Sequence, residues 1–266
     1  MRTIYLTLFA ALLGLSACEW GKPPIPENNV FTDTLAYEYK TIHERAADCG
    51  DKPDSTCTTV DIKYPIFNEQ AKLNDTIVAK LLSMFAYEKP DSNLTIYVKN
   101  FLKQYQDFRK DDPRSEMFFA LNSYAKVLLQ DSGLVTLETG GYTFQGGAHG
   151  SSYTGYINWD TKANKNLDLK DIVVDGSYNK LTKIAEGIFR KDEKLTDASS
   201  LANDYFFKDN KFALNENFSV TPLGLKFLYN QYEIKPYAAG QTELLVPYAQ
   251  IKQLMRPNTV VSHYVK

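Results

Sequence analysis

An apolar segment at residues 4–14, directly after a short cationic start that contains Arg2, most constrains what this chain can fold into. The segment is too short to cross a bilayer, which takes about 20 apolar residues in a helix. A cationic start followed by a short apolar run is instead typical of a signal peptide, which the mature protein lacks. We therefore expect the folded part of the chain to begin after this segment, in an exported protein.

Leu15, Ser16, Ala17 and Cys18 follow the apolar segment at once. A leucine, two small residues and a cysteine resemble the bacterial lipobox, in which the cysteine is lipidated and the chain is cut before it. We predict a lipoprotein signal peptide at residues 1–17 and lipidation of Cys18, with an ordinary signal peptide that happens to contain a cysteine as the alternative. Several acyl chains, at roughly 0.8 kcal/mol per buried CH₂, give stable anchoring to a membrane.

Residues 18–29 are predicted to form a tether between the lipid and the folded protein. The segment is polar and contains Pro23, Pro24 and Pro26, so it is stiff and cannot bury a core. Residue 19 is glutamate rather than aspartate, which by the sorting rule of Gram-negative lipoproteins indicates the outer membrane. We expect a lipid-anchored protein of the bacterial cell envelope, at the outer membrane and facing the periplasm or the cell surface.

Composition and charge exclude several classes of protein. The 266 residues are 44% hydrophobic and 13% aromatic and include only 14 Gly, 11 Pro and 3 Cys. These figures exclude intrinsic disorder, collagen-like repeats and a small disulfide-dense scaffold. The 30 basic and 32 acidic side chains give a net charge of −2 without a basic stripe, so no nucleic-acid partner is expected. The length allows one or two domains.

Cys49 and Cys57 remain once Cys18 is lipidated. They flank a segment rich in Asp, Pro, Gly and Ser, and in an oxidising compartment two such cysteines favour a disulfide that closes a β-hairpin. A zinc site would need two more ligands, for which His43 is the neighbouring candidate, and free thiols are the remaining alternative. We predict the Cys49–Cys57 disulfide.

Apolar periodicity predicts strands and helices in the first part of the mature chain. Strands are expected at residues 31–40 and 58–64, the second ended by Pro65. One helix is expected to be capped by Asn68 and a second to begin near residues 91–92. Their apolar stripes are predicted to pack in the core, and they consist of Leu73, Ile77, Leu81 and Phe85 in the first helix and Leu94, Val98, Phe101, Tyr105 and Phe108 in the second.

The rest of the chain is dominated by predicted strands. They lie at residues 117–130, 134–139, 142–145, 153–159, 218–221, 225–229 and 243–246, with helices from Ser177 and at residues 248–255. Strands and helices do not alternate as regular βαβ units. We therefore predict an α+β fold with largely antiparallel sheets, helices packed on one face, and two closely packed α/β subdomains.

Residues that signal chemistry are few. The chain has three histidines and no HExxH, paired CxxC, GxSxG or phosphate-binding glycine loop, so no metal site and no cofactor are expected. His149, in the segment FQGGAHGSS, is a candidate general base beside Ser151 or Ser152. Sequence identifies no carboxylate to orient it, and a base so close in sequence to its nucleophile rarely has a rigid geometry. A hairpin with a hydrogen-bonded histidine is the alternative, and no catalytic residue is predicted.

The same glycine-rich segment is the candidate binding surface. Glycines there indicate positive φ angles or close backbone approach, and tyrosine is a rigid amphipathic contact residue for proteins and glycans. The candidate binding residues are Tyr142, Phe144, Gly146, Gly147, His149, Ser151 and Tyr153, with Tyr156 and Trp159 nearby. Asp168, Asp171 and Asp175 are too sparse for a calcium loop and are predicted to cap a helix after Ile172.

Two segments resemble a known family. Residues 218–240, with the motifs TPLGLKF and YEIKPYAAG, and the strand ending at Pro247 resemble the C-terminal domain of RsiV-like proteins. Residues 142–150 resemble the companion domain, which is also found beside polysaccharide deacetylase domains such as that of PdaC. The resemblance implies a PdaC/RsiV-type N-terminal domain at residues 30–165, an RsiV-type C-terminal domain at residues 166–257, and a tail at residues 258–266.

In this family the two domains form the extracellular part of the RsiV anti-sigma factor, which binds lysozyme, and many relatives are lipoproteins. The present chain departs from that pattern because it has no cytoplasmic sigma-binding segment, no transmembrane helix and no deacetylase domain with an Asp/His metal motif. The resemblance implies a non-enzymatic envelope module that binds a protein or a cell-wall glycan, with lysozyme binding or inhibition as its sharpest form and lysozyme or peptidoglycan as expected partners. The alternatives are an enzyme that modifies cell-wall glycan and a structural or assembly factor of the envelope.

Overall fold

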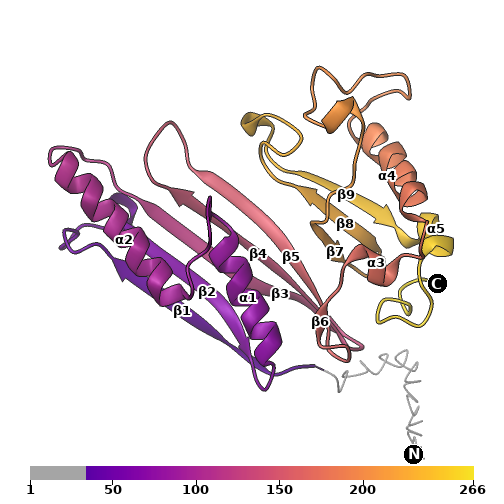
Figure 1. The fold of residues 1–266 in the computed structure, drawn as a ribbon, viewed down its shortest axis with the longest axis horizontal. Helices are drawn as coiled ribbons and strands as arrows, with labels where there is room; N and C mark the ends of the chain where they lie inside the picture. The colour runs from indigo at the N-terminus through magenta and orange to yellow at the C-terminus, as the bar shows by residue number, and fades with distance from the viewer. Residues whose placement is uncertain (1–33) are drawn as a thin grey trace, which may run out of the picture. The chain divides into compact units, whose positions relative to one another are not determined.

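A six-stranded sheet and a three-stranded sheet form the framework of the protein (Figure 1). The computed structural model describes residues 34–266, which fall in one compact unit. The predicted signal peptide, Cys18, the tether and the start of the first predicted strand lie outside the described residues. The α+β class with largely antiparallel sheets is confirmed. Within residues 34–266, no helix has the length and apolar character that a membrane span requires.

The larger sheet has the strand order β1-β2-β3-β4-β5-β6. Its strands are β1 (Tyr37–Arg45), β2 (Thr59–Phe67), β3 (Ala120–Asp131), β4 (Leu134–Phe144), β5 (Ser151–Asp160) and β6 (Lys165–Asn166). Neighbouring strands are antiparallel except β2 and β3, which are parallel. A parallel pair needs a long crossover, and here the crossover carries the helices α1 (Ala71–Ser83) and α2 (Leu94–Asp111).

Helices α1 and α2 pack on one face of this sheet (Figure 1). The predicted stripes face the sheet, with Leu73, Ile77, Leu81, Leu94, Val98, Phe101 and Tyr105 buried and Phe85 and Phe108 partly buried. They meet the alternate strand residues that point the same way, among them Ile62, Leu121 and Ile157. The Asn93 side chain caps α2 by accepting a hydrogen bond from the backbone N–H of Ile96 at 2.9 Å.

Two predicted boundaries in this region are wrong. Pro65 does not end β2, which continues to Phe67, because β2 pairs with β3 only as far as Lys63. Beyond that point a strand tolerates a residue without an N–H. Asn68 does not cap α1, which begins at Ala71; its N–H donates to the Ala36 carbonyl at 2.9 Å instead.

The central strands also differ in extent from the prediction. Strand β4 runs unbroken through Gly140 and Gly141, where sequence predicts a break between two strands. Gly140 pairs with Tyr124 of β3 and with Thr154 of β5, so the ladders on both sides hold the glycine pair in an extended conformation. Sequence predicts a break at the two glycines because glycine is a weak strand former.

The Cys49–Cys57 disulfide is confirmed. Both cysteines are buried and lie in the connection between β1 and β2, so the disulfide closes the first hairpin as predicted. Their Cα atoms are 5.5 Å apart. The pairing rules out the alternatives of free thiols and of zinc held by these cysteines and His43.

Loss of this disulfide is expected to lower the free energy of unfolding by about 2–3 kcal/mol, the value for a short closed loop. The measurement compares urea unfolding of the native protein with that of the double variant Cys49→Ser/Cys57→Ser, with and without reductant. Reductant should lower the stability of the native protein to that of the variant and leave the variant unchanged. Equal stability of both proteins without reductant, or two alkylatable thiols in periplasmically produced protein, contradicts the prediction.

The C-terminal part contains the second sheet, in the order β7-β8-β9. Its elements are α3 (Leu169–Ile172), α4 (Tyr178–Asp192), β7 (Phe218–Val220), β8 (Gly224–Tyr229), β9 (Thr242–Pro247) and α5 (Tyr248–Ile251). The predicted hairpin of β7 and β8, the strand β9 and the helix after Ser177 are confirmed. The closing helix is shorter than predicted, because α5 ends at Ile251 and a 3-10 turn, Lys252–Leu254, follows.

The predicted capping role of three aspartates is wrong in part. Asp168 and Asp171 belong to the start of the short helix α3, not to a helix after Ile172, and the Asp171 carboxylate accepts the Asp168 N–H at 2.9 Å. Asp175 forms an ion pair with Arg256. Arg256 also donates to the Lys170 carbonyl, so Asp175 and Arg256 fasten the chain after α5 to α3.

Two asparagine side chains connect β5 to the C-terminal part by pairing with backbone. Asn158, 2% exposed, donates to the Phe218 carbonyl and accepts from the Val220 N–H, both at 2.8 Å. Asn230 accepts from the Thr154 N–H at 2.8 Å and donates to the Thr154 carbonyl at 2.9 Å. Each amide satisfies one donor and one acceptor of a strand, so we call the two side chains the asparagine clamps.

Candidate binding site

The turn between β4 and β5 contains the glycine-rich segment. Gly146 and Gly147 have φ angles of 95° and 93°, a region that side chains with a Cβ rarely adopt. A Cβ at Gly146 would also lie 2.7 Å from the Met117 sulfur. The glycines therefore permit the turn that places His149 directly before the start of β5.

His149 packs against two tyrosines from the C-terminal part of the chain. Its ring stacks on Tyr237, with centroids 3.9 Å apart and an interplanar angle of 20°. Tyr232 is the second neighbour, at 6.2 Å between centroids, and the two tyrosine rings are 5.5 Å apart. We call His149, Tyr232 and Tyr237 the aromatic cluster.

Hydrogen bonds fix the tautomer of His149. Nδ1 lies 2.9 Å from the Gly150 carbonyl oxygen, which can only accept, so Nδ1 carries the proton. Nε2 lies 3.4 Å from the Tyr232 hydroxyl, a group that can donate or accept a hydrogen bond. Both nitrogens have partners, and neither Ser151 nor Ser152 is among the hydrogen-bond partners of His149 that the described residues provide.

Tyr232 is held in an unusual conformation. Its φ angle of 64° lies in the left-handed region, which a bulky residue adopts only when its surroundings enforce it. The side chain is nevertheless 58% exposed. Residues held in sparsely populated backbone regions cluster at functional sites, where interactions elsewhere balance the strain.

The remaining predicted binding residues differ in their exposure to solvent. Tyr142 is exposed, as is Ser151 at the start of β5. Phe144 is partly buried, with its ring 6.4 Å from that of Phe118. Tyr153 is partly buried, and burial, followed by the negative charge of Glu233, raises its pKa.

Tyr156 and Trp159 do not form part of the surface. They are 6% and 2% exposed, and Trp159 belongs to the core beneath α1 and α2. Tyr156 lies on the other face of the sheet, where Lys226 of β8 extends over its ring at 5.2 Å. Both residues have a structural role, in contrast to the contact role that their position near the glycine motif suggests.

Tyr232 and Tyr237 are not among the site residues that the sequence predicts. His149 and Tyr232 are 83 positions apart, so no local pattern joins them. The available signal is the motif YEIKPYAAG, which begins at Tyr232 and contains Tyr237. The structure thus brings together the two motif segments that carry the family resemblance.

Comparison with known families gives two matches that do not overlap. Residues 52–152 match the family described as "Deacetylase PdaC", and residues 170–249 match the family described as "Protein of unknown function (DUF3298)". His149 lies in the first range, and Tyr232 and Tyr237 lie in the second. No curated protein matches the chain.

Two solved structures share the fold. A DUF3298 family protein from Pseudomonas aeruginosa is 27% identical, with a TM-score of 0.68 over 85% of this chain and 96% of that one. A member of the same family from Bacteroides fragilis is 24% identical, with a TM-score of 0.67 over 86% of this chain and 97% of that one. At 24% identity, the similarity to the Bacteroides fragilis protein shows a shared fold and nothing about function.

Proposed function

Because this chain consists of a PdaC-type domain followed by a DUF3298 domain, as its sequence predicts, we propose that it is a non-enzymatic binding protein of the bacterial cell envelope. The two domains indicate an envelope-type domain family. In this proposal a lipid on Cys18 anchors the protein to the outer membrane. Its partner is a protein, and a lysozyme-type muramidase is the first candidate, as the resemblance to RsiV implies.

The aromatic cluster is the observation that carries the proposal. Tyrosine and histidine rings combine apolar faces with polar edges and lose little conformational entropy on binding. Here the rings are fixed by stacking and by the His149–Tyr232 contact, while Tyr232 stays 58% exposed. Rigid aromatic anchors of this kind dominate the energetics of protein interfaces.

Electrostatics favour a cationic partner over an anionic one. The chain carries a net charge of −2, and Glu233 follows Tyr232 directly in the sequence. A charge of this size gives mild steering and does not supply affinity by itself. A muramidase with a basic surface meets this requirement.

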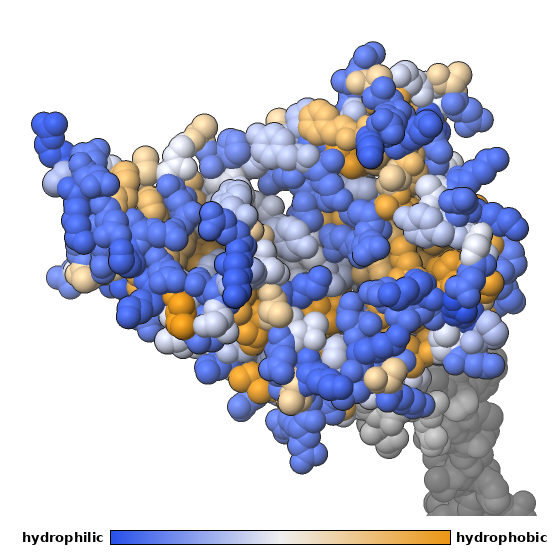
Figure 2. Space-filling model, in the orientation of Figure 1, coloured by the Kyte–Doolittle hydropathy of each residue, from blue (hydrophilic) through white to orange (hydrophobic). Residues whose placement is uncertain are grey.

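The geometry gives less support to the two alternatives. A glycan-modifying enzyme based on His149 would need a carboxylate or a serine in contact with its ring, whereas its nitrogens contact Gly150 and Tyr232. A structural or assembly factor would be favoured by a large apolar patch. On the face shown in Figure 2, apolar residues are interspersed with hydrophilic ones.

We expect residues 30–266, which include the whole described unit, to bind at least one lysozyme of a panel with a dissociation constant of about 1 μM or lower in calorimetry. Tyr237→Ala, which removes the ring that supports His149, should weaken binding at least about tenfold. Tyr39→Ala, at an exposed tyrosine of β1, is the matched control and should leave affinity unchanged.

Muramidase activity measured in the same samples distinguishes two forms of the proposal. Loss of activity on binding identifies an inhibitor, and retained activity identifies capture or sensing. Failure of every lysozyme to bind, or equal binding by the native protein and Tyr237→Ala, overturns the proposed partner and site. Thermal melting of each variant confirms that it is folded.

A further inference from the structure

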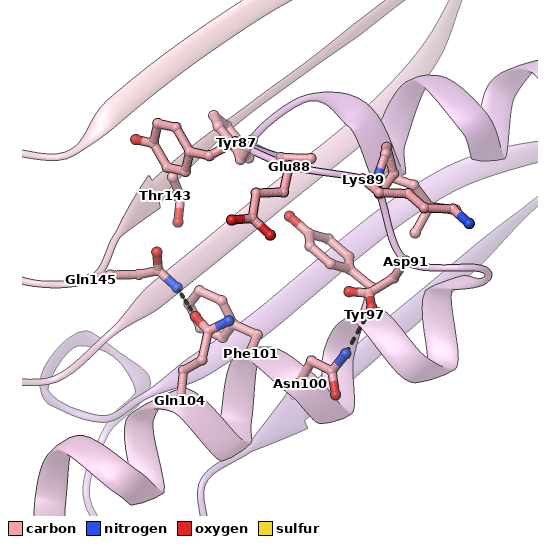
Figure 3. Close-up of a pocket in the computed structure, with 14 residues that line it drawn as sticks. Tyr87, Glu88, Lys89, Asp91, Tyr97, Asn100, Phe101, Gln104, Thr143 and Gln145 are labelled. Carbon is pink, nitrogen blue, oxygen red and sulfur yellow. Dashed lines mark hydrogen bonds between the residues drawn. The ribbon is translucent and has the colours of Figure 1, made fainter.

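A hollow of about 250 Å³ lies on the helix-covered side of the six-stranded sheet (Figure 3). Its walls are the connection between α1 and α2, the first turns of α2, and the end of β4. We propose that this pocket binds a saccharide and holds one neutral or amino sugar ring. The proposal does not rest on the proposed protein partner, because the pocket and the aromatic cluster share no residue.

The polar lining offers both hydrogen-bond donors and acceptors. The Glu88 carboxylate points into the pocket toward the Tyr97 hydroxyl and the Gln145 side chain (Figure 3). Gln145 donates to the Gln104 side-chain oxygen at 2.8 Å, and Asn100 donates to Asp91 at 2.7 Å. Each amide thereby has a fixed orientation and keeps further donor or acceptor capacity for a ligand.

Sugar hydroxyls match this mixture better than a simple cation does. A hydroxyl donates one hydrogen bond and accepts two, so a ring with several hydroxyls can pair with carboxylates and amides together. An ammonium group only donates, so it cannot pair with the second N–H of either amide, which a hydroxyl oxygen can accept. Burial, followed by the charge of Asp91, raises the pKa of Tyr97 to about 12, so its hydroxyl stays protonated and remains a donor.

Aromatic rings give the pocket an apolar wall. Tyr97 and Phe101, successive on one face of α2, both line it, and Phe101 is buried in the core behind it. The C–H face of a sugar ring can pack on the partly exposed Tyr97 ring while its hydroxyls reach the polar groups. The volume is below the range of roughly 300–1,000 Å³ found for sites of drug-sized ligands, which fits a single ring.

The charges select against acidic sugars. Glu88 and Asp91 contribute two carboxylates, and the Lys89 ammonium points away from Gln145 and Thr143 (Figure 3). A uronic acid or a phosphorylated sugar would bring a like charge next to these two carboxylates, which repel it. Neutral and amino sugars avoid this repulsion.

The pocket and the aromatic cluster are formed by different residues. Thr143 lines the pocket among residues of α2, so its neighbour Tyr142 points to the opposite face, because successive strand residues alternate. A variant in one site therefore leaves the other intact. The two proposals can be tested separately in one protein.

Calorimetric titration of residues 30–266 with tri-N-acetylchitotriose, cellotriose and trigalacturonate tests the saccharide site. We expect at least one of the two neutral trisaccharides to bind with a dissociation constant of about 1 mM or lower, and the acidic one to show no binding. Glu88→Ala and Tyr97→Phe should each weaken binding about tenfold or more. Glu38→Ala, at an exposed carboxylate of β1, is the matched control.

The proposal is overturned if neither neutral trisaccharide binds, if trigalacturonate binds equally well, or if both pocket variants retain native affinity. The lysozyme titration repeated with Glu88→Ala should give native affinity, and the saccharide titration repeated with Tyr237→Ala should do the same. A negative binding result at one site therefore does not affect the conclusion about the other site.

Discussion

Replacing Asn158 with alanine is expected to lower the free energy of unfolding by about 2–5 kcal/mol. The side-chain amide is 2% exposed and is one of the asparagine clamps, pairing with the Val220 N–H and the Phe218 carbonyl at 2.8 Å. Alanine leaves both backbone groups buried without a partner, and each such group costs about 1–3 kcal/mol. For a domain of this size the melting temperature should fall by roughly 5–15 °C.

Two further variants separate the hydrogen bonds from the shape of the side chain. Asn158→Asp keeps the shape but cannot donate to the Phe218 carbonyl, so it should also be destabilising. Asn122→Ala, at an exposed asparagine of β3, is the matched control and should change stability by less than about 0.5 kcal/mol. Native-like melting of Asn158→Ala in calorimetry would show that the clamp does not hold β7 to β5.

Replacing Gly224 with alanine is expected to destabilise the protein by about 3 kcal/mol or more. Gly224 is buried at the start of β8, where it pairs with Pro247 of β9. A Cβ there would lie 2.8 Å from the Pro247 Cα and still closer to the Val246 carbonyl oxygen. These atoms are backbone of the paired strand, so they can move only if the sheet distorts, and overpacking of this kind costs about 1–3 kcal/mol or more.

Gly187→Ala is the matched control for Gly224→Ala. Gly187 lies within α4, and nothing is within 4 Å of the position that its Cβ would take. Alanine is a better helix former than glycine, so this variant should be more stable by up to about 1 kcal/mol. Urea unfolding of both variants is the measurement, and a Gly224→Ala protein as stable as the native one contradicts the expectation.

The helices and strands with a clear periodicity of apolar residues could be predicted from the sequence. Leu73, Ile77 and Leu81 recur at helical spacing, and the buried face of α1 follows directly. The hairpin of β7 and β8 is equally local, because a Pro-Leu-Gly turn joins two short apolar runs. The predicted end of β2 at Pro65 and the predicted helix cap at Asn68 are wrong because both depend on which strand lies alongside. Neighbouring residues in the sequence do not reveal that strand.

The candidate binding site was predicted only in part for the same reason. The glycine turn and His149 are consecutive in the sequence, so their proximity could be predicted. Tyr232 and Tyr237 reach His149 only through the packing of the C-terminal part of the chain against β5. That packing also buries Tyr156, since Lys226 covers its ring, and no pattern within residues 153–159 reveals this cover.

The parallel contact between β2 and β3 has a consequence for the order of folding. The β1–β2 hairpin and the strands β3, β4 and β5 each form from neighbouring segments, whereas β2 and β3 meet only after residues 68–119 have been looped out. Long-range closure of this kind slows folding, because chain entropy is lost before the contact stabilises anything. The looped segment contains α1, α2 and most of the saccharide pocket. The segment that forms most of the pocket is thus the same one that must be looped out before β2 and β3 can pair.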